Sequence, residues 1–363
     1  MRSKLWLSVV GVLAILGIIF SIGGIQQKQT EQSNITQEFD YRFVKESKIS
    51  ESSYYPDIEY ANGKLYASFF EDGPNQKVVY ILDENLSVLE GPINLEIGPD
   101  HEIVYLDGYF YLSLTYHLLP GGQSLLLVKY DENFNEISRI FAFENDNFEE
   151  SNDQFFSVYE GKLYNMNLAY PAPGEKSTIL RVYDKDLNLL SKYTLEQERT
   201  SQGEAEVKGH IAKMKDGNWV IIGTDYTKQN EEIRLLASIY DNNFNLVSRK
   251  NITSSENYED HFQLFPYDMK KVGDYYFVTH RSTDRAGGKT NAHGYLSIFD
   301  ENLALVRKIK ITDHDENVLS LPMIRFCISE NKIFFIYTLH DATNIAGGGG
   351  QRAYIRVFEK TSG

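Results

Sequence analysis

The sequence predicts an all-β protein made of repeated four-stranded antiparallel units, and three observations support this. One phrase recurs along the chain, with an aromatic or aliphatic residue, an acid, and Asn or Asp in a fixed order. Its copies begin at Leu82, Tyr130, Tyr183, Tyr240 and Phe299, and their acids follow at steps of 48, 53, 57 and 59 residues. The segments before these copies have strand-like composition, and a second hairpin signal precedes each copy.

Each copy of the phrase predicts two strands joined by a tight turn. Segments such as Ser124–Tyr130 and Thr178–Tyr183 are rich in residues that fit a half-buried strand. The Asp and Asn that follow turn the chain, because their side chains bond nearby backbone groups and tolerate left-handed conformations. The preceding hairpins are marked by Asn62-Gly63, Asp107-Gly108, Glu160-Gly161, Asp216-Gly217, Gly273-Asp274 and Glu330-Asn331. Each repeat is therefore expected to be a four-stranded meander.

The repeat length is typical of the blades of a β-propeller. Five repeats begin near Tyr55, Glu102, Asp153, Lys208 and His261, and a sixth runs from about Pro322 to Glu359. The sixth repeat lacks an outer strand, whereas residues 43–50 match the outer strands Leu246–Thr253 and Leu305–Thr312 in their apolar positions. We therefore expect residues 39–50 to complete the sixth blade, because closing the ring removes exposed sheet edges.

This pattern resembles the six-bladed β-propellers with N-terminal strand closure, and the resemblance covers nearly all of the chain after its first segment. It is a resemblance of architecture. The sequence contains neither an SxDxGxxW box nor a YWTD repeat. The resemblance therefore implies a fold and no particular activity.

The first 38 residues predict a membrane anchor followed by a spacer. Leu5–Ile25 carries no charge and is about long enough to cross a bilayer as a helix. Arg2 and Lys4 precede it, which favours an N-terminus in the cytoplasm and an exported remainder. We therefore interpret residues 1–25 as an uncleaved transmembrane helix, with signal-peptide cleavage and secretion as the alternative. Residues 26–38 are polar and are interpreted as a spacer before the propeller at residues 39–363.

Composition narrows the class of protein. The formal net charge of −15 argues against nucleic acid as a partner and against lying flat on anionic lipid. Cys327 is the only cysteine, so the chain forms no internal disulfide. An exported chain of this size without disulfides fits an archaeal or bacterial cell surface.

The candidate site follows from the expected connections between strands. The tight turns belong to one face of the propeller, and the long, dissimilar connections belong to the other, which we call the long-loop face. Binding residues often lie on such loops. The histidines and several acids are expected on that face, and the candidate ligand-binding residues are His101, Glu102, His210, Asp260, His261, His280 and His340.

Imidazole and carboxylate groups that converge at a channel mouth would suit a divalent metal such as Ca²⁺, Zn²⁺ or Mn²⁺. The candidate metal ligands are His101, His210, His261 and Asp260. The alternative is a solvated acidic rim, since polar residues gather in loops anyway. No HExxH motif or EF-hand spacing supports the metal.

Two classes of function remain open. The leading hypothesis is a membrane-anchored binding module that recognises a protein or glycan through the long-loop face. The rival is an exported, metal-dependent hydrolase, lyase or lactonase-like enzyme with its site at the channel mouth. Sequons at Asn34, Asn85 and Asn251 are candidate glycosylation sites in an exported protein.

Overall fold

The computed structural model describes residues 39–50, 53–71, 76–95, 101–118, 122–142, 149–170, 177–195, 198–200, 203–206, 209–227, 232–253, 261–284, 292–312, 323–339 and 352–361. Phe43–Glu359 form one compact unit, which contains the six blades except the outer ends of two strands, and Met1–Arg42 with Lys360–Gly363 are assigned to a second, small unit. The first unit is a six-bladed β-propeller of four-stranded antiparallel blades, as the sequence predicts.

The first three blades each consist of four consecutive strands, given from the centre outward. Blade 1 contains β2 (Ser53–Ala61), β3 (Lys64–Glu71), β4 (Gln76–Leu82) and β5 (Val88–Leu95). Blade 2 contains β6 (His101–Leu106), β7 (Tyr109–Leu118), β8 (Gly122–Tyr130) and β9 (Glu136–Phe141). Blade 3 contains β10 (Glu149–Tyr159), β11 (Lys162–Tyr170), β12 (Ser177–Tyr183) and β13 (Leu189–Leu195).

The other three blades show two additions to this plan. Blade 4 contains β16 (Ile211–Lys213), β17 (Trp219–Thr227), β18 (Glu232–Tyr240) and β19 (Leu246–Asn251), and the short β14 (Glu198–Thr200) and β15 (Gly203–Glu206) extend its sheet. Blade 5 contains β20 (His261–Val272), β21 (Tyr275–Asp284), β22 (Ala292–Phe299) and β23 (Leu305–Lys310). Blade 6 contains β24 (Ile324–Ile328), β25 (Lys332–Leu339) and β26 (Arg352–Lys360), and its fourth strand is β1 (Tyr41–Ser50).

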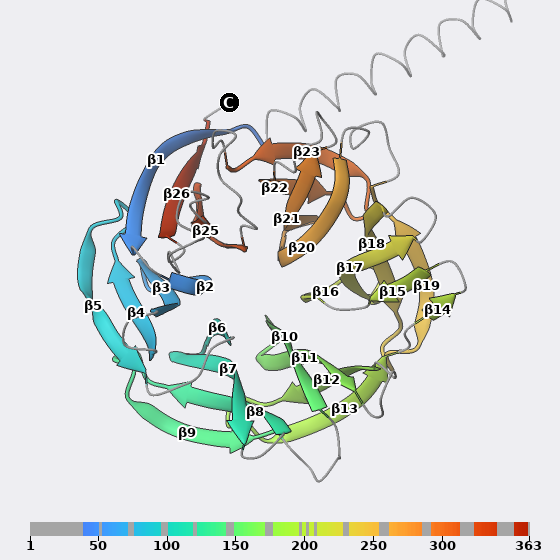
Figure 1. The fold of residues 1–363 in the computed structure, drawn as a ribbon, viewed down its shortest axis with the longest axis horizontal. Helices are drawn as coiled ribbons and strands as arrows, with labels where there is room; N and C mark the ends of the chain where they lie inside the picture. The colour runs from blue at the N-terminus through green and yellow to red at the C-terminus, as the bar shows by residue number, and fades with distance from the viewer. Residues whose placement is uncertain are drawn as a thin grey trace, which may run out of the picture. The chain divides into compact units, whose positions relative to one another are not determined.

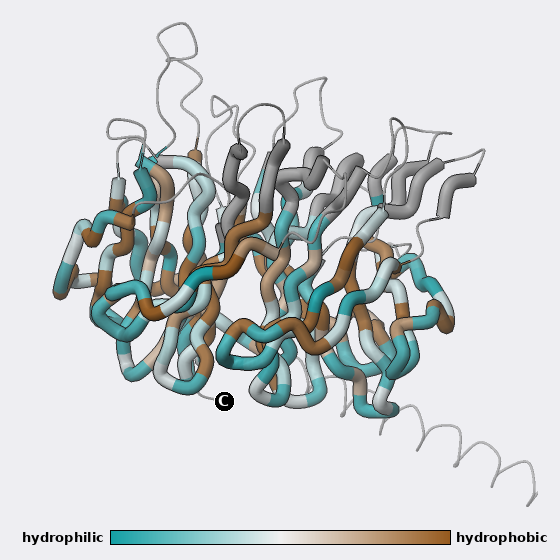
Figure 2. Tube along the Cα trace, turned by 90° about the horizontal axis from the view of Figure 1, so that it is seen from below, coloured by the Kyte–Doolittle hydropathy of each residue, from teal (hydrophilic) through white to brown (hydrophobic). Residues whose placement is uncertain are grey.

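The innermost strands face the axis of the propeller, which we call the central channel, and the outermost strands form the rim (Figure 1). Two kinds of turn lie at one face of the propeller. The first turn joins the first and second strands of each blade, and the other joins the third and fourth strands of blades 1 to 5. Seen from the side, these turns are hydrophilic, whereas the strands between them carry hydrophobic stretches (Figure 2). We call this face the turn face.

The recurring phrase forms the turn between the third and fourth strands of blades 1 to 5. In the copy that begins at Tyr130, Asp131 Oδ1 accepts the backbone N–H groups of Asn133 and Asn135 at 2.9 and 2.8 Å. The acids of the other four copies accept the same two N–H groups. These bonds explain why an acid recurs at this position.

The apolar residue of the phrase packs between neighbouring blades. It adopts a left-handed conformation in every copy, with φ between 58° and 63°, at Leu86, Phe134, Leu187, Phe244 and Leu303. Phe134 lies 4.9 Å from the ring of Phe110 and 6.0 Å from that of Tyr66, so it joins blade 2 to blade 1. Left-handed backbone is unfavourable for such residues, and burial of the side chain offsets that cost.

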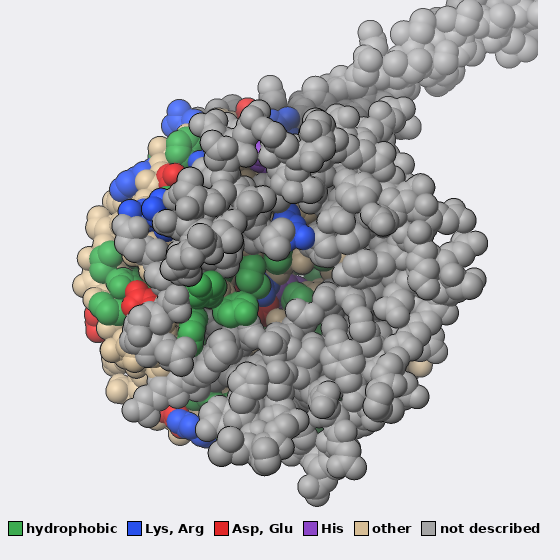
Figure 3. All heavy atoms as spheres, viewed as in Figure 1, with side chains coloured by type: hydrophobic (Ala, Val, Ile, Leu, Met, Phe, Trp, Pro, Cys, Tyr) green, Lys and Arg blue, Asp and Glu red, His purple; other side chains and the backbone are tan. Residues whose placement is uncertain are grey.

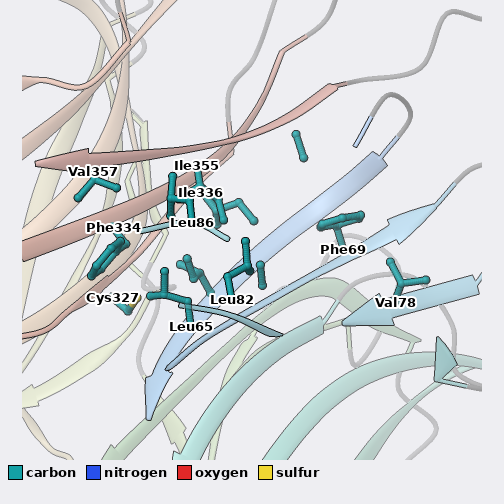
Figure 4. Close-up of a cluster of buried hydrophobic side chains, with 13 residues drawn as sticks. Leu65, Phe69, Val78, Leu82, Leu86, Cys327, Phe334, Ile336, Ile355 and Val357 are labelled. Carbon is teal, nitrogen blue, oxygen red and sulfur yellow. The ribbon is translucent and has the colours of Figure 1, made fainter. Parts of the chain in front are cut away.

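Strand β1 closes the ring, as the sequence predicts. Phe43 packs edge-on against Phe358, and Glu46 pairs with Arg356, so β1 runs antiparallel to β26. On the other side of blade 6, Cys327 and Phe334 share an apolar cluster with Leu86 of blade 1 (Figure 4). The six blades thus form a closed circle of packed sheets.

The predicted transmembrane helix and spacer, residues 1–38, lie outside the described residues. Among the residues that the structure does describe, no helix is long and apolar enough to cross a membrane.

Candidate functional site

Six side chains occupy equivalent positions, five on innermost strands and the sixth, His210, directly before the innermost strand β16. Each lies five residues before the first residue of the first turn of its blade. These residues, which we call the central ring, are Asp57, Glu102, Phe155, His210, Asp268 and Arg325. All six are buried, although five of them carry a charge or an imidazole. Figure 3 shows acidic, basic and histidine side chains together at the centre of the ring of blades, between hydrophobic ones.

Glu102 of blade 2 connects three other blades. Its Oε1 lies 2.5 Å from Nη2 of Arg325 in blade 6, and its Oε2 lies 3.1 Å from Nε2 of His210 in blade 4. The backbone N–H of Phe156 in blade 3 donates to the same Oε2. This carboxylate therefore spans the channel.

His210 and Phe155 complete the contacts across the channel. The Nδ1 atom of His210 lies 3.5 Å from Oδ1 of Asp268, so a carboxylate faces each ring nitrogen of this imidazole. The ring of Phe155 lies edge-on to the imidazole, 5.4 Å between centroids, and 5.9 Å from Cζ of Arg325. The central ring is thus filled by its own side chains.

The acids of the central ring also bind backbone groups of the next blade. Asp57 Oδ2 accepts the N–H of Ile103 at 2.6 Å, and Asp268 Oδ2 accepts the N–H of Phe326 at 3.1 Å. These N–H groups lie on β6 and β24, which are the innermost strands of their sheets and pair, among the described strands, only with β7 and β25. A buried donor without a partner is costly, so the acids hold the blades together.

A cavity of about 600 Å³ lies between the central ring and the first turns of blades 3, 4 and 5. Asp57, Glu102, His210 and Asp268 belong to its floor. Its lining also includes Tyr159, Met214 and four lysines, at positions 213, 215, 270 and 271. We call it the central cavity. Its lining residues carry carboxylate, ammonium and phenol groups, and the ring of Tyr159 packs against Trp219 with 5.2 Å between centroids.

The environment shifts the pKa values of two carboxyl groups of the floor in opposite directions. Burial raises the pKa of Asp57 to about 7, although Arg325 opposes the shift. Burial also disfavours ionised Glu102, but the charges of Arg325 and His210 outweigh it and hold the pKa of Glu102 below its ordinary value. Asp57 is therefore the group that holds a proton near neutral pH, and Glu102 is ionised.

The structure brings together two of the predicted site residues, Glu102 and His210. His101 and His261 are the first residues of β6 and β20, at the ends of innermost strands, and their side chains lie outside the described residues. Asp260 and His340 lie outside them entirely. His280 is not part of the central ring, because it is buried in β21, with Nε2 2.9 Å from Ser297 Oγ and its ring stacked on Tyr295.

The predicted metal site and long-loop face stay predictions. Among the described side chains, no group of three or more His, Cys, Asp or Glu residues has the arrangement of a metal site. Most of the long connections lie outside the described residues. The central cavity lies on the turn side of the central ring, whereas the sequence predicted a site on the long-loop face.

Two of the three predicted glycosylation sites lie among the residues that the structure describes. Asn85 lies exposed in a turn of blade 1, and Asn251 ends β19, where its Oδ1 accepts the N–H of Thr253 at 3.0 Å. Asn34 lies outside the described residues.

Sequence reasoning missed Phe155, Asp268 and Arg325 and did not place Asp57 in the site. The hairpin dipeptides contain the necessary signal, because counting back five residues from Asn62, Asp107, Glu160, Gly273 or Glu330 gives a residue of the central ring. The same count fails in blade 4 when it starts at Asp216, because the turn of that blade begins one residue earlier, at Lys215.

Comparison with solved structures agrees with this class of fold. A protein of unknown function from Dyadobacter fermentans is similar with a TM-score of 0.63 and 12% identity, over 88% of this chain and 99% of that one. A subtype N11 neuraminidase-like protein of A/flat-faced bat/Peru/033/2010 (H18N11) is similar with a TM-score of 0.51 and 10% identity, over 89% and 94% of the two chains.

At these identities the likeness shows the fold alone. No known family model matches the sequence, and no curated protein is significantly similar to it. The chain is therefore a six-bladed β-propeller closed by its N-terminal strand.

Proposed function

We propose that this chain is a membrane-anchored, exported binding module that recognises a small, hydroxyl-rich ligand, such as a saccharide, in the central cavity. The observation that carries the proposal is the cavity itself. Its volume of about 600 Å³ lies in the range of small-molecule sites. Its carboxylates and lysines suit hydroxyl groups, and the ring of Tyr159 suits the apolar face of a sugar.

The contacts of the floor favour binding over catalysis. Glu102 and Asp268 each contact the imidazole of His210, and Glu102 also contacts Arg325. Groups that are already bonded to one another supply a fixed polar surface for recognition. A nucleophile or a metal ligand has to be free to contact the reacting atoms.

The test is a thermal-shift screen of the full chain in detergent against a panel of neutral and acidic saccharides. A ligand that binds only the folded state raises the melting temperature. We expect at least one saccharide to raise it. In Met214→Trp, which replaces a lining residue of the cavity with a larger one, the rise should be lost, whereas Leu190→Trp on the outer strand β13 should retain it. An equal rise in both variants would place the ligand elsewhere.

A second candidate is an exported hydrolase, and one observation favours it. The pKa of Asp57 is raised to about 7, whereas that of Glu102 is lowered, and such a pair suits a general acid and a general base. Chromogenic glycosides and esters test this candidate. Turnover that is lost in both Asp57→Asn and Glu102→Gln would support it.

A chelator tests whether this second candidate depends on a bound metal. If His101, His261 and Asp260 hold a metal, a chelator will lower the melting temperature and Ca²⁺, Zn²⁺ or Mn²⁺ will restore it selectively. Equal melting with and without chelator would exclude that site.

A further inference from the structure

The central ring contains more carboxyl groups than permanent cations. Asp57, Glu102 and Asp268 come from blades 1, 2 and 5, and the guanidinium of Arg325 is the one permanent positive charge among the six residues. His210 adds a second positive charge only when its imidazole is protonated. With all three carboxyl groups ionised, the central ring has a net negative charge in a buried place.

Contacts show where that excess charge lies. Glu102 contacts both Arg325 and His210, and Asp268 contacts His210. Asp57 instead accepts two backbone N–H groups, from Ile58 at 2.8 Å and Ile103 at 2.6 Å. None of the ion pairs formed by the described residues includes Asp57.

The groups that face Asp57 from neighbouring strands leave the excess of negative charge in the central ring unchanged. Glu102 on β6 and Asp268 on β20 disfavour a negative charge on Asp57, whereas Arg325 on β24 and the backbone N–H of Ile103 on β6 favour it. Two residues further along β2 and β20, Glu59 and Lys270 form their own ion pair at 3.2 Å. That pair is neutral, so it adds little to either side.

We propose that Asp57 is a proton-dependent latch of the central ring. With a proton on Asp57, the carboxyl groups that remain are those of Glu102 and Asp268, which contact Arg325 and the imidazole of His210, and the blades stay closely packed around the channel. When the proton is lost, a third buried negative charge repels Glu102 and Asp268 and loosens the floor of the central cavity. This inference is independent of the ligand that the cavity binds.

The sign of the effect follows from the environment of the group. Burial raises the pKa of Asp57 from 3.8 to about 7 in the folded chain. A carboxyl group with a raised pKa stabilises the fold most at low pH, and this contribution is lost as the pH rises towards about 7. The contribution of Asp57 therefore increases as the pH falls below about 7.

The test measures the melting temperature of the full chain between about pH 8 and about pH 5.5, in wild type, Asp57→Asn and Glu330→Gln. Glu330 is an exposed acid in a turn, and its variant is the control. We expect wild type and the control to gain a few degrees on acidification, and Asp57→Asn to lack this gain. An equal gain in Asp57→Asn would overturn the proposal.

A second measurement uses wild type alone, in case Asp57→Asn does not fold. Infrared spectra of the chain with labelled aspartate carboxyl groups report a protonated carboxyl directly. We expect its C=O band at about pH 5.5 and its loss by about pH 8.5. Absence of the band at about pH 5.5 would overturn the proposal as well.

Discussion

Glu102 and His210 lie 108 residues apart in the chain, yet their carboxylate and imidazole meet at 3.1 Å across the central channel. They belong to blades 2 and 4, so blade 3 lies between them along the circle. This contact links blades that do not pack side by side. The buried side chains of the channel therefore stabilise the ring of blades as well as form the floor of the cavity.

Glu102→Gln tests the strength of that link. The change leaves the guanidinium of Arg325 buried without its charged partner, and breaking a buried ion pair typically costs about 3 to 5 kcal/mol. Because the pKa of Glu102 is lowered in the folded chain, its contribution is present above 4.5 and is lost as the pH falls. Urea unfolding at several pH values should show a large loss at neutral pH and a smaller one in acid. A loss that does not depend on pH would contradict the assigned charge.

Phe134→Ala tests the left-handed apolar residue of the recurring phrase. Its ring is buried between blades 1 and 2, against Tyr66 and Phe110. Its removal should lower the free energy of unfolding by about 3 kcal/mol. The exposed neighbour Asn133 provides the matched control, and Asn133→Ala should change the free energy by less than about 0.5 kcal/mol. Similar losses of unfolding free energy in the two variants would mean that the change in the turn, and not the loss of the buried ring, destabilises the protein.

Removal of the closing strand tests the closure of the sheet. A chain that begins at Glu51 lacks β1 and exposes the edge of β26, which invites association with other chains. We expect this chain to self-associate in sedimentation experiments, whereas a chain that begins at Phe39 stays monodisperse. A synthetic peptide of Tyr41–Ser50 should restore the behaviour of the longer chain. If the shorter chain is monodisperse without the peptide, the strand is dispensable.

The proposed anchor has a direct test in cells. The full chain should remain in the membrane fraction after alkaline extraction, and a variant that lacks residues 1–25 should be soluble. Protease added outside intact cells should digest the propeller, because the proposed orientation puts it outside the cytoplasm. Release of the full chain into the medium would instead support signal-peptide cleavage.

Much of the architecture could be predicted from local signals. The acid at Asp131 and the dipeptide Asn62-Gly63 mark turns through contacts within a few residues, so their role is visible in the sequence. The match between residues 43–50 and the other outer strands likewise predicted β1, because an outer strand has a recognisable pattern of apolar residues.

The central ring was harder to predict, because its contacts join residues from different blades. Arg325 is an ordinary basic residue of a strand in the sequence, and only the closed circle brings it to Glu102. Histidines near acids at loop ends are visible in the sequence, and this pattern includes Glu102 and His210. Asp57, Asp268 and Arg325 share only a common distance from the first turn of their blades, which the folded structure shows.

The location of a bound saccharide tests the central claim most directly. The chain should be crystallised with the saccharide that gives the largest thermal shift, alongside crystals without it. We expect new density in the central cavity, between the central ring and the first turns of blades 3, 4 and 5, in contact with Tyr159. Density confined to the opposite, long-loop face would contradict the proposed site.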